Sequence, residues 1–313
     1  MDRNLALEFL RVTEVAAIAA ASWIGKGDPK AADHAAVDEM RSRLNEVNFR
    51  GRVVIGEGRK DEAAELYVGE ELGKGDGLEL DIAVDPLECT DSVAYGRPNA
   101  ISLIATAPKG TLLQGPDTYM NKLAVGPQAV GKLHLNAPVR DNLQALSQAL
   151  DKNIEELKIV VMDRPRNQNL INDIRSVGAR VELITDGDVA AGLAPSLPDP
   201  EVDALMGIGG SAETVLTAAA LKALGGEIQA SWWLEKHPYL EDEIKSLGMK
   251  IDKVYGMNDF LKDEHVTFTA SGIINGPLLK GVRYTADSVI THSVVMRAKT
   301  RTVRWVEAKH KID

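Results

Sequence analysis

The chain has 313 residues, 44% of them hydrophobic and 26% charged, which is an ordinary composition for a globular protein with an ample core. Its formal net charge of −10 argues against a nucleic-acid partner, because such partners are held by clustered Lys and Arg. The single cysteine, Cys89, excludes an intramolecular disulfide, and the longest nearly apolar run, residues 15–24, is shorter than the roughly 20 residues that span a bilayer. We therefore expect a cytoplasmic protein with no membrane partner.

Two helices are expected at the start of the chain. Apolar residues recur at helical spacing from residue 4 to 25, where Gly25 and Gly27 end the pattern, and again from about residue 30 to 47. The period then changes from helical to strand-like. Three strand-like runs follow, at residues 52–55, 78–84 and 100–107.

Strands and helices alternate in the rest of the chain. Strand-like runs lie at residues 158–162, 180–184, 204–208, 266–270, 281–284, 292–297 and 302–306. Helical patterns lie at residues 141–149, 167–177 and 214–224. This alternation predicts a layered α/β fold. We expect two domains, residues 1–155 and 156–313, with the last strands belonging to either one.

Charged side chains follow five of the predicted strands at the point where each strand ends. They are Glu57, Asp85 with Glu88, Arg164 with Arg166, Asp186 with Asp188, and Glu213. Ligands of open α/β sheets bind beyond the carboxyl ends of the strands, so five such loops predict one polar cleft. Any one of these carboxylates alone would more often be a turn residue or a helix cap.

The sharpest local motif is the hexapeptide of residues 85–90. Asp85 ends a buried strand, Pro86 stiffens the turn, and Glu88 can return to the same point in space. Two carboxylates and a backbone carbonyl form a hard-oxygen site suited to Mg²⁺ or Mn²⁺, and no cluster of His and Cys competes for zinc. A capped turn is the alternative interpretation of these six residues alone.

This hexapeptide resembles the Asp-Pro-(Leu/Ile)-(Asp/Glu)-Gly-Thr metal motif of the lithium-sensitive phosphatase superfamily. The resemblance to one branch, the class II fructose-1,6-bisphosphatases, extends along nearly the whole chain. The matching stretches are residues 11–14, 27–28, 32–33, 54–58, 81–88, 116–120, 162–166, 186–189, 207–210 and 291–297. Their common order makes the resemblance highly specific. It implies a layered αβαβα sugar-phosphatase fold and a homo-oligomer, dimer or tetramer.

The resemblance also implies a role for particular residues. Metal ligands for Mg²⁺ or Mn²⁺ would be Asp33, Glu57, Asp85, Glu88 and Glu213. Substrate contacts would be Glu88, Cys89, Thr90, Tyr119, Arg164, Pro165, Arg166, Asp186, Gly187, Asp188 and Gly210. Asp61 and Thr90 would together position and activate the attacking water. The implied reaction is hydrolysis of the C1 phosphate of D-fructose 1,6-bisphosphate to give fructose 6-phosphate and phosphate.

The residue chemistry agrees with these implied roles. Two guanidinium groups flanking Pro165 can clamp a second phosphate away from the metals, although without the resemblance they would be surface charges on a solvated loop. The sequence departs from the family beside its carboxylates rather than at them. Departures lie at Arg59, Ala64, Cys89, Ser211 and Thr214. They leave two alternatives: additional activity on sedoheptulose 1,7-bisphosphate, or a sugar-phosphate-binding paralogue with impaired catalysis.

Overall fold

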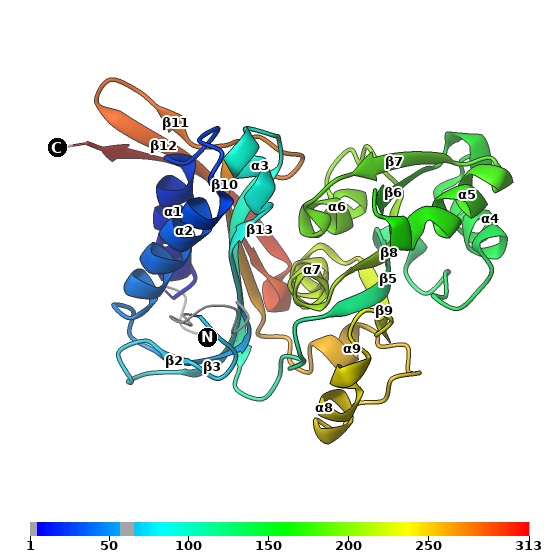
Figure 1. The fold of residues 1–313 in the computed structure, drawn as a ribbon, viewed down its shortest axis with the longest axis horizontal. Coiled ribbons are helices and arrows are strands. Elements are labelled where there is room, and N and C mark those ends of the chain that lie inside the picture. Colours follow the sequence, from blue (N-terminus) through cyan, green and yellow to red (C-terminus); the bar gives the residue numbers. More distant parts are fainter. Residues whose placement is uncertain (1–4, 57–65, 313) are drawn as a thin grey trace. The chain divides into compact units, whose positions relative to one another are not determined.

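The computed structural model describes residues 5–56 and 66–312 and divides into two compact units (Figure 1). The first unit joins Met1–Leu113 to Lys262–Asp313, and the second is Gln114–Leu261. The expected boundary near residue 155 therefore differs from the observed division, since it falls inside the second unit. The physical reason is strand pairing, because strands formed after residue 262 complete the sheet begun before residue 113.

The first unit is built on an eight-stranded sheet of its described residues. Six strands follow the order β11-β12-β10-β4-β3-β1, β2 pairs with β1 at one end, and β13 pairs with β12. Only the β1–β3 pair is parallel among these pairings. The strands are β1 (Arg50–Ile55), β2 (Glu71–Leu72), β3 (Glu79–Glu88), β4 (Ala100–Pro108), β10 (Thr267–Ile274), β11 (Arg283–Tyr284), β12 (Ser288–Arg297) and β13 (Thr302–Lys311).

Two long helices cover one face of this sheet (Figure 1). They are α1 (Leu5–Ala21) and α2 (Pro29–Leu44), and the short α3 (Thr90–Tyr95) follows β3. Asp28 caps α2 by accepting a 3.0 Å hydrogen bond from the Ala31 amide, and Pro29 occupies the first turn, where its missing amide hydrogen costs nothing. The helices bury a mainly aliphatic core, in which Phe9 meets Phe49 edge to face at 5.3 Å.

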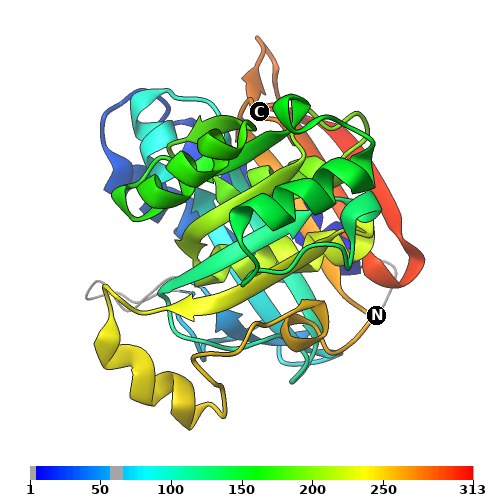
Figure 2. The same cartoon turned by 90° about the vertical axis from the view of Figure 1, so that its right-hand side faces the viewer.

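The second unit places its sheet between two layers of helices. The sheet order is β7-β6-β8-β5-β9, with parallel β6–β7 and β6–β8 pairs and antiparallel β5–β8 and β5–β9 pairs. The strands are β5 (Tyr119–Val125), β6 (Lys158–Met162), β7 (Arg180–Ile184), β8 (Ala204–Gly210) and β9 (Glu227–Trp233). Figure 2 looks onto the face covered by α4 and α5, and α6 and α7 lie on the opposite face.

The α-helices of this unit differ in length, from the 4 residues of α9 to the 14 residues of α7. The α-helices are α4 (Val139–Leu150), α5 (Gln168–Val177), α6 (Asp188–Leu193), α7 (Ser211–Leu224), α8 (Glu241–Ser246) and α9 (Met257–Phe260). Leu143 and Leu146 of α4 and Ile171 and Ile174 of α5 pack against the sheet in one aliphatic core. No helix in the described part of the chain is long and apolar enough to cross a membrane.

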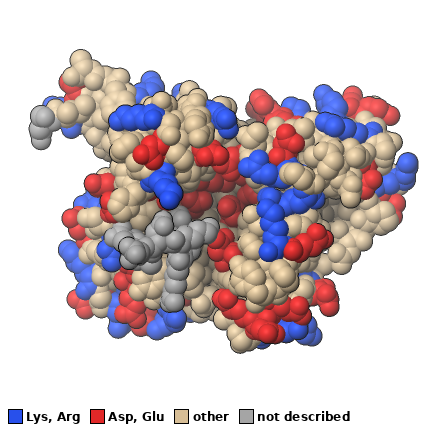
Figure 3. All heavy atoms as spheres, in the orientation of Figure 1, with Lys and Arg blue, Asp and Glu red and all other residues tan. Residues whose placement is uncertain are grey.

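The predicted α/β class is confirmed, and most predicted elements are present within a few residues. Three strands of the described residues were not predicted: the two-residue β2 of the first unit, and β5 and β9 of the second. The strand predicted at residues 78–84 is longer than expected, because β3 continues past Pro86 to Glu88. On the face drawn in Figure 3, basic and acidic atoms are interspersed, and acidic atoms gather over α8, which begins Glu-Asp-Glu.

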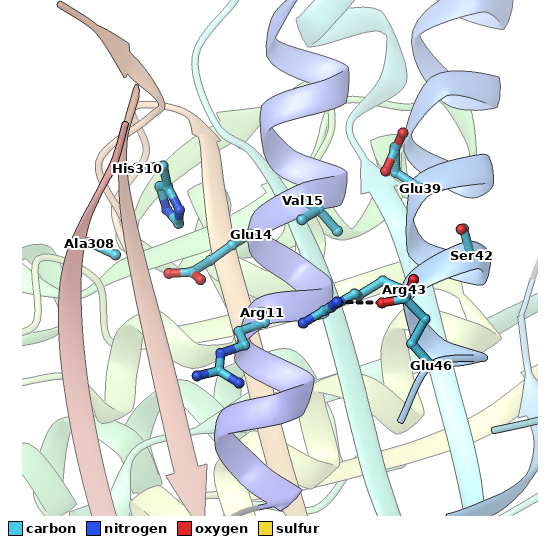
Figure 4. Close-up of a pocket in the computed structure, with 9 residues that line it drawn as sticks. All are labelled: Arg11, Glu14, Val15, Glu39, Ser42, Arg43, Glu46, Ala308 and His310. Atoms are coloured by element: carbon cyan, nitrogen blue, oxygen red, sulfur yellow. Dashed lines mark hydrogen bonds and ion pairs between the residues drawn. The ribbon is translucent and has the colours of Figure 1, made fainter. Parts of the chain in front are cut away.

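A polar cluster, called here the polar seam, lies between α1 and the strands β12 and β13 of the first unit and consists of Glu14, Thr291 and His310. The Glu14 side chain points toward β12 and β13, where the Thr291 hydroxyl donates to Glu14 Oε1 at 3.1 Å and lies 2.9 Å from His310 Nε2. An open cavity of about 560 Å³ exposes this seam between α1, α2 and β13 (Figure 4). Burial raises the pKa of Glu14, although Thr291, His310 and Arg11 each act to lower it.

We expect Glu14→Gln to stabilise the protein at pH 8 and to have little effect at pH 4. A carboxyl group whose folded pKa is raised stabilises the fold below its unfolded pKa, and this contribution is lost as pH rises through the folded pKa. Glutamine keeps the acceptor for Thr291 and removes the cost of burying a charge. Urea unfolding at both pH values measures the difference. A variant that is less stable than the parent at pH 8 would contradict this interpretation.

Candidate functional site

A bulge in β3 brings two of the predicted metal ligands to one face of the first sheet. Asp85 pairs with Leu103 and Glu88 with Ile101, so three steps along β3 match two steps along β4. Residues three apart in a regular strand face opposite ways, but Leu103 and Ile101 are two apart and share a face. The extra residue therefore turns Glu88 onto the same side as Asp85, which is how bulges re-aim side chains beside sites.

The turn after β3 holds the next two candidates. Cys89 has φ 75° and ψ 52°, the left-handed conformation expected where the family carries glycine. Its thiol is buried in the apolar core of the first unit, so the side chain is accommodated there. Thr90 begins α3, and its hydroxyl donates to the Leu87 carbonyl at 3.3 Å. The Leu87 amide in turn donates to Asp85 Oδ1 at 3.1 Å, which ties the turn to the carboxylate.

The remaining first-unit candidates are only partly described. Asp33 is half-buried in the second turn of α2, a helix that packs against β3 and α3. Glu57 and Asp61 lie outside the described residues. The first unit thus carries Asp33, Asp85, Glu88, Cys89 and Thr90 on neighbouring elements. The candidates from Tyr119 to Glu213 belong to the second unit.

In the second unit, the two arginines lie on the turn after β6. Pro165 begins a single 3₁₀ turn, residues Pro165–Asn167, which leads into α5. Arg166 donates from Nε to the Ile208 carbonyl at 3.0 Å, and its guanidinium lies 4.4 Å from the centre of the Tyr119 ring. Burial is the main cause that lowers the Arg166 pKa. Arg164 is half-buried, and its Nη1 donates to the neighbouring Asp163 carbonyl at 3.2 Å.

Asn167 fixes this arginine turn and was not singled out from the sequence. It is buried, its Nδ2 donates to the Met162 and Ile208 carbonyls at 3.1 and 3.3 Å, and its Oδ1 accepts from the Ile208 amide at 2.8 Å. The side chain therefore joins the end of β6 to the end of β8. Its place directly after Arg-Pro-Arg and before a helix was the available signal.

The carboxylates of the second unit lie at two helix starts. Gly187, with φ 84°, allows the turn that places Asp188 as the first residue of α6. Gly210 precedes α7, and Glu213 lies in the first turn of that helix rather than just before it. A Cβ on Gly210 would come within 1.8 Å of Glu213 Oε2, so only glycine lets this carboxylate fold back over the helix start.

Two departures from the family fit this arrangement. The Ser211 hydroxyl donates to the Pro116 carbonyl at 2.8 Å and accepts from the Thr118 amide at 3.1 Å, which fastens the start of α7 to the segment before β5. The Thr214 hydroxyl donates to the Gly210 carbonyl at 2.8 Å. Both hydroxyls are thus satisfied within the second unit, beside the candidate residues.

The carboxyl group of Glu213 is buried beside a second acid of the same unit. Burial, and next the nearby Asp188 charge, raise the pKa of Glu213 to about 7, and Lys122 opposes the rise. Glu213 Oε2 and Asp188 Oδ1 are buried without a hydrogen-bond partner in the described structure. A buried carboxylate oxygen without a hydrogen-bond partner costs folding free energy. Such oxygens are typical of sites that bind a cation or a polar ligand.

The residues present fit a hard divalent cation. The candidate donors are carboxylate oxygens, which Mg²⁺ and Mn²⁺ prefer. Within the described ranges, no three His, Cys, Asp or Glu side chains gather as a metal cluster. Glu57, which the resemblance implies as a ligand, lies outside those ranges, so convergence of the five carboxylates stays a prediction.

Comparison with known proteins gives one consistent result. The model of the family described as bacterial fructose-1,6-bisphosphatase, glpX-encoded, matches residues 3–310. The chain is 44% identical to a class 2 fructose-1,6-bisphosphatase of Haemophilus influenzae, over 100% of this chain and 98% of that protein. It is 43% identical to a Synechococcus protein named as a class 2 D-fructose 1,6-bisphosphatase/sedoheptulose 1,7-bisphosphatase, over 100% and 97% of the two chains.

A solved structure, an extragenic suppressor from Pyrococcus furiosus, matches more weakly. It covers 60% of this chain and 70% of its own, with 17% identity and a TM-score of 0.30, which is too low to carry an argument. The full-length sequence matches instead place the protein among the bisphosphatases, enzymes that hydrolyse phosphoric monoesters. Within that class, the chain belongs to the class 2, glpX-encoded fructose-1,6-bisphosphatase family.

We expect Cys89→Gly to be more stable than Cys89→Ala by about 1 kcal/mol, because both lose the buried sulfur and only glycine loses the left-handed strain. Urea unfolding of the two variants measures this difference, and it does not depend on how much the sulfur itself contributes. Equal stabilities would mean that the turn relaxes out of the left-handed region when the thiol is removed.

Proposed function

We propose that this protein hydrolyses the C1 phosphate of D-fructose 1,6-bisphosphate and requires Mg²⁺ or Mn²⁺ to do so. The observation that carries the proposal is the family match over residues 3–310, with one relative named for this activity at 44% identity over the full length. Supporting it are the bulged β3 with two carboxylates on one face and the arginine turn of the second unit.

The acidic residues would hold the metal and the attacking water. We assign the metal ligands to Asp33, Glu57, Asp85, Glu88 and Glu213. Bound cations neutralise phosphoryl oxygens and lower the pKa of a bound water. Asp61 and the Thr90 hydroxyl would orient that water for attack. Thr90 suits this role because it begins α3 directly after the Asp85–Glu88 bulge.

The second unit would bind the sugar and its distant phosphate. Phosphoryl transfer depends mainly on positioning and charge, so the residues that hold the substrate matter as much as those that act on the water. Among the described residues, Arg166 is hydrogen-bonded to the Ile208 carbonyl through Nε alone, which leaves both terminal nitrogens for phosphate oxygens. The Tyr119 ring supports the flat face of the guanidinium. The further contacts would be Glu88, Cys89, Thr90, Arg164, Pro165, Asp186, Gly187, Asp188 and Gly210.

A second activity, on sedoheptulose 1,7-bisphosphate, is favoured by one observation. Two Synechococcus relatives at 43% identity carry both activities in their names. Both sugars are ketose bisphosphates with a phosphate at each end, so the same arginine turn would serve either. We further propose that the protein acts in the cytoplasm as a homo-oligomer. An impaired paralogue would bind these sugars and release no phosphate, which a panel of sugar phosphates distinguishes.

Removal of divalent metals should abolish phosphate release, and Mn²⁺ or Mg²⁺ should restore it. Asp85→Asn should lower kcat/KM at least about 100-fold, because loss of even a supporting group around a metal costs about 10–100-fold. Metal should also raise the melting temperature of the parent, since a ligand that binds only the folded state stabilises it.

The matched control is Asp242→Asn, which removes an exposed carboxylate of α8. It should behave as the parent in both measurements. Full turnover after exhaustive chelation, or unchanged activity in Asp85→Asn, would overturn the assignment of the metal site.

Arg166→Ala should weaken action on fructose 1,6-bisphosphate far more than on fructose 1-phosphate, which lacks the distant phosphate. Loss of one charge-assisted contact costs about 1.5–3 kcal/mol, or one to two decades in kcat/KM. Arg166→Lys keeps the charge but not the planar fork and should fall between. The control is Arg175→Ala, an exposed arginine near the end of α5. Equal losses on both substrates would place the Arg166 side chain away from the second phosphate.

A further inference from the structure

A lysine is buried where an apolar residue would be expected on β5. Lys122 is 2% exposed and shares one face of the strand with Met120 and Ala124, the face that α6 and α7 cover. Taking an ammonium group out of water costs several kcal/mol, so a lysine at such a position requires partners that compensate it. An aliphatic side chain would serve the packing of this layer better than a charge does.

The partners of Lys122 are the starting points of both helices. Its Nζ donates to Asp188 Oδ2 at 2.8 Å, at the first residue of α6, and to the Gly210 carbonyl at 3.0 Å, immediately before α7. Helix starts carry partial positive charge and normally repel a cation. The lysine therefore lies there because of Asp188, and it joins the starts of two helices, α6 at Asp188 and α7 at Ser211.

Gly209 shows how closely this contact is built. A Cβ on Gly209 would come within 1.9 Å of Asp188 Oδ2 and 2.9 Å of both Cε and Nζ of Lys122. The Lys122–Asp188 ion pair thus occupies the space that a side chain at position 209 would fill, so this residue must be glycine. The strand β8, the lysine and the aspartate fit one another as a unit, and a methyl group at Gly209 would separate the pair without removing any charged group.

The lysine uses only one oxygen of Asp188. The other, Oδ1, is buried without a protein partner, as is Oε2 of Glu213 one helical turn into α7. The Gly210 carbonyl, fixed by Lys122 and by the Thr214 hydroxyl, holds the backbone from which Glu213 projects. The lysine thereby sets the position of two carboxylate oxygens that make no bond within the described protein.

We propose that Lys122 is a positioning residue of the phosphatase reaction: it holds Asp188 and the start of α7 so that the unpartnered oxygens of Asp188 and Glu213 meet the sugar bisphosphate and its cation. The inference rests on the roles proposed above for these two acids. In this role Lys122 acts through the two protein groups to which its Nζ donates, the Asp188 carboxylate and the Gly210 carbonyl.

The test is a double-mutant cycle of Lys122→Met and Asp188→Asn, with steady-state kinetics and with calorimetric binding of fructose 6-phosphate to metal-free protein. Lys122→Met should weaken binding and lower kcat/KM by about one to two decades, the loss expected for a charge-assisted contact. The double variant should lose clearly less than the product of the two single losses, because part of the lysine's effect passes through the Asp188 carboxylate. Lys122→Arg should recover part of the loss.

The matched control is Lys152→Met, which removes a lysine from another buried aspartate of the same unit. Lys152 Nζ donates to Asp203 Oδ1 at 2.6 Å, so its loss should lower stability and leave substrate binding unchanged. If Lys122→Met does not fold, Gly209→Ala decides the matter, since it separates the pair and should give the same binding loss. The melting temperature of each variant shows which of them is folded.

Three outcomes would overturn the proposal. The first is a folded Lys122→Met, or Gly209→Ala in its place, with the kinetics and binding of the parent. The second is a double variant whose loss equals the product of the two single losses, which would show independent roles. The third is a binding loss of equal size in Lys152→Met, which would make the effect one of general stability. A parent protein that releases no phosphate from any sugar bisphosphate would instead overturn the proposed function, so the two failures are distinguishable.

Discussion

A carboxylate withdrawn from water must be paired, protonated or bound to a cation, and this constraint sorts the acids of both units. Asp81 accepts the Thr111 and Leu112 amides at 2.8 and 3.1 Å, and Asp203 accepts the Lys152 ammonium and the Lys158 amide at 2.6 and 2.8 Å. These acids are satisfied by the fold and serve it.

Asp188 and Glu213 differ because each keeps a buried oxygen that the described fold leaves unsatisfied. Their helices begin at the ends of short glycine-containing turns, where a helix start favours negative charge. The helix starts that place Asp188 near Glu213 supply no hydrogen-bond partner for Asp188 Oδ1 or Glu213 Oε2 within the described residues. These unsatisfied oxygens lower the stability of the second unit at this point, and the surrounding hydroxyl and lysine contacts limit the cost.

The sequence was informative where local rules decide the structure and less so where a distant partner does. The β6 and β7 strands have the predicted bounds because apolar runs between turn residues specify them. The β3 strand was predicted to end before Pro86, since proline normally ends a ladder, and the bulge that carries β3 to Glu88 depends on its pairing with β4. The left-handed Cys89 was expected only because the family carries glycine there.

The β5 strand was missed because Asn121 and Lys122 in its middle indicate a loop. A buried lysine becomes plausible only when Asp188, 66 residues later, is known to lie beside it, and no local pattern carries that information. The β9 strand, by contrast, alternates regularly between buried and half-buried side chains, so its signal was present in Glu227–Trp233 and was overlooked.

The path of the chain also has a consequence for synthesis. The first unit stops after Leu113 and resumes at Lys262, and its sheet needs β10 between β4 and β12. On a ribosome adding about 5–20 residues per second, the intervening segment of about 150 residues takes roughly 7–30 seconds to emerge. During that time the inner edge of β4 has no neighbour, although its residues are buried in the finished protein. Early recognition of this nascent edge by a chaperone would protect it from pairing with another chain.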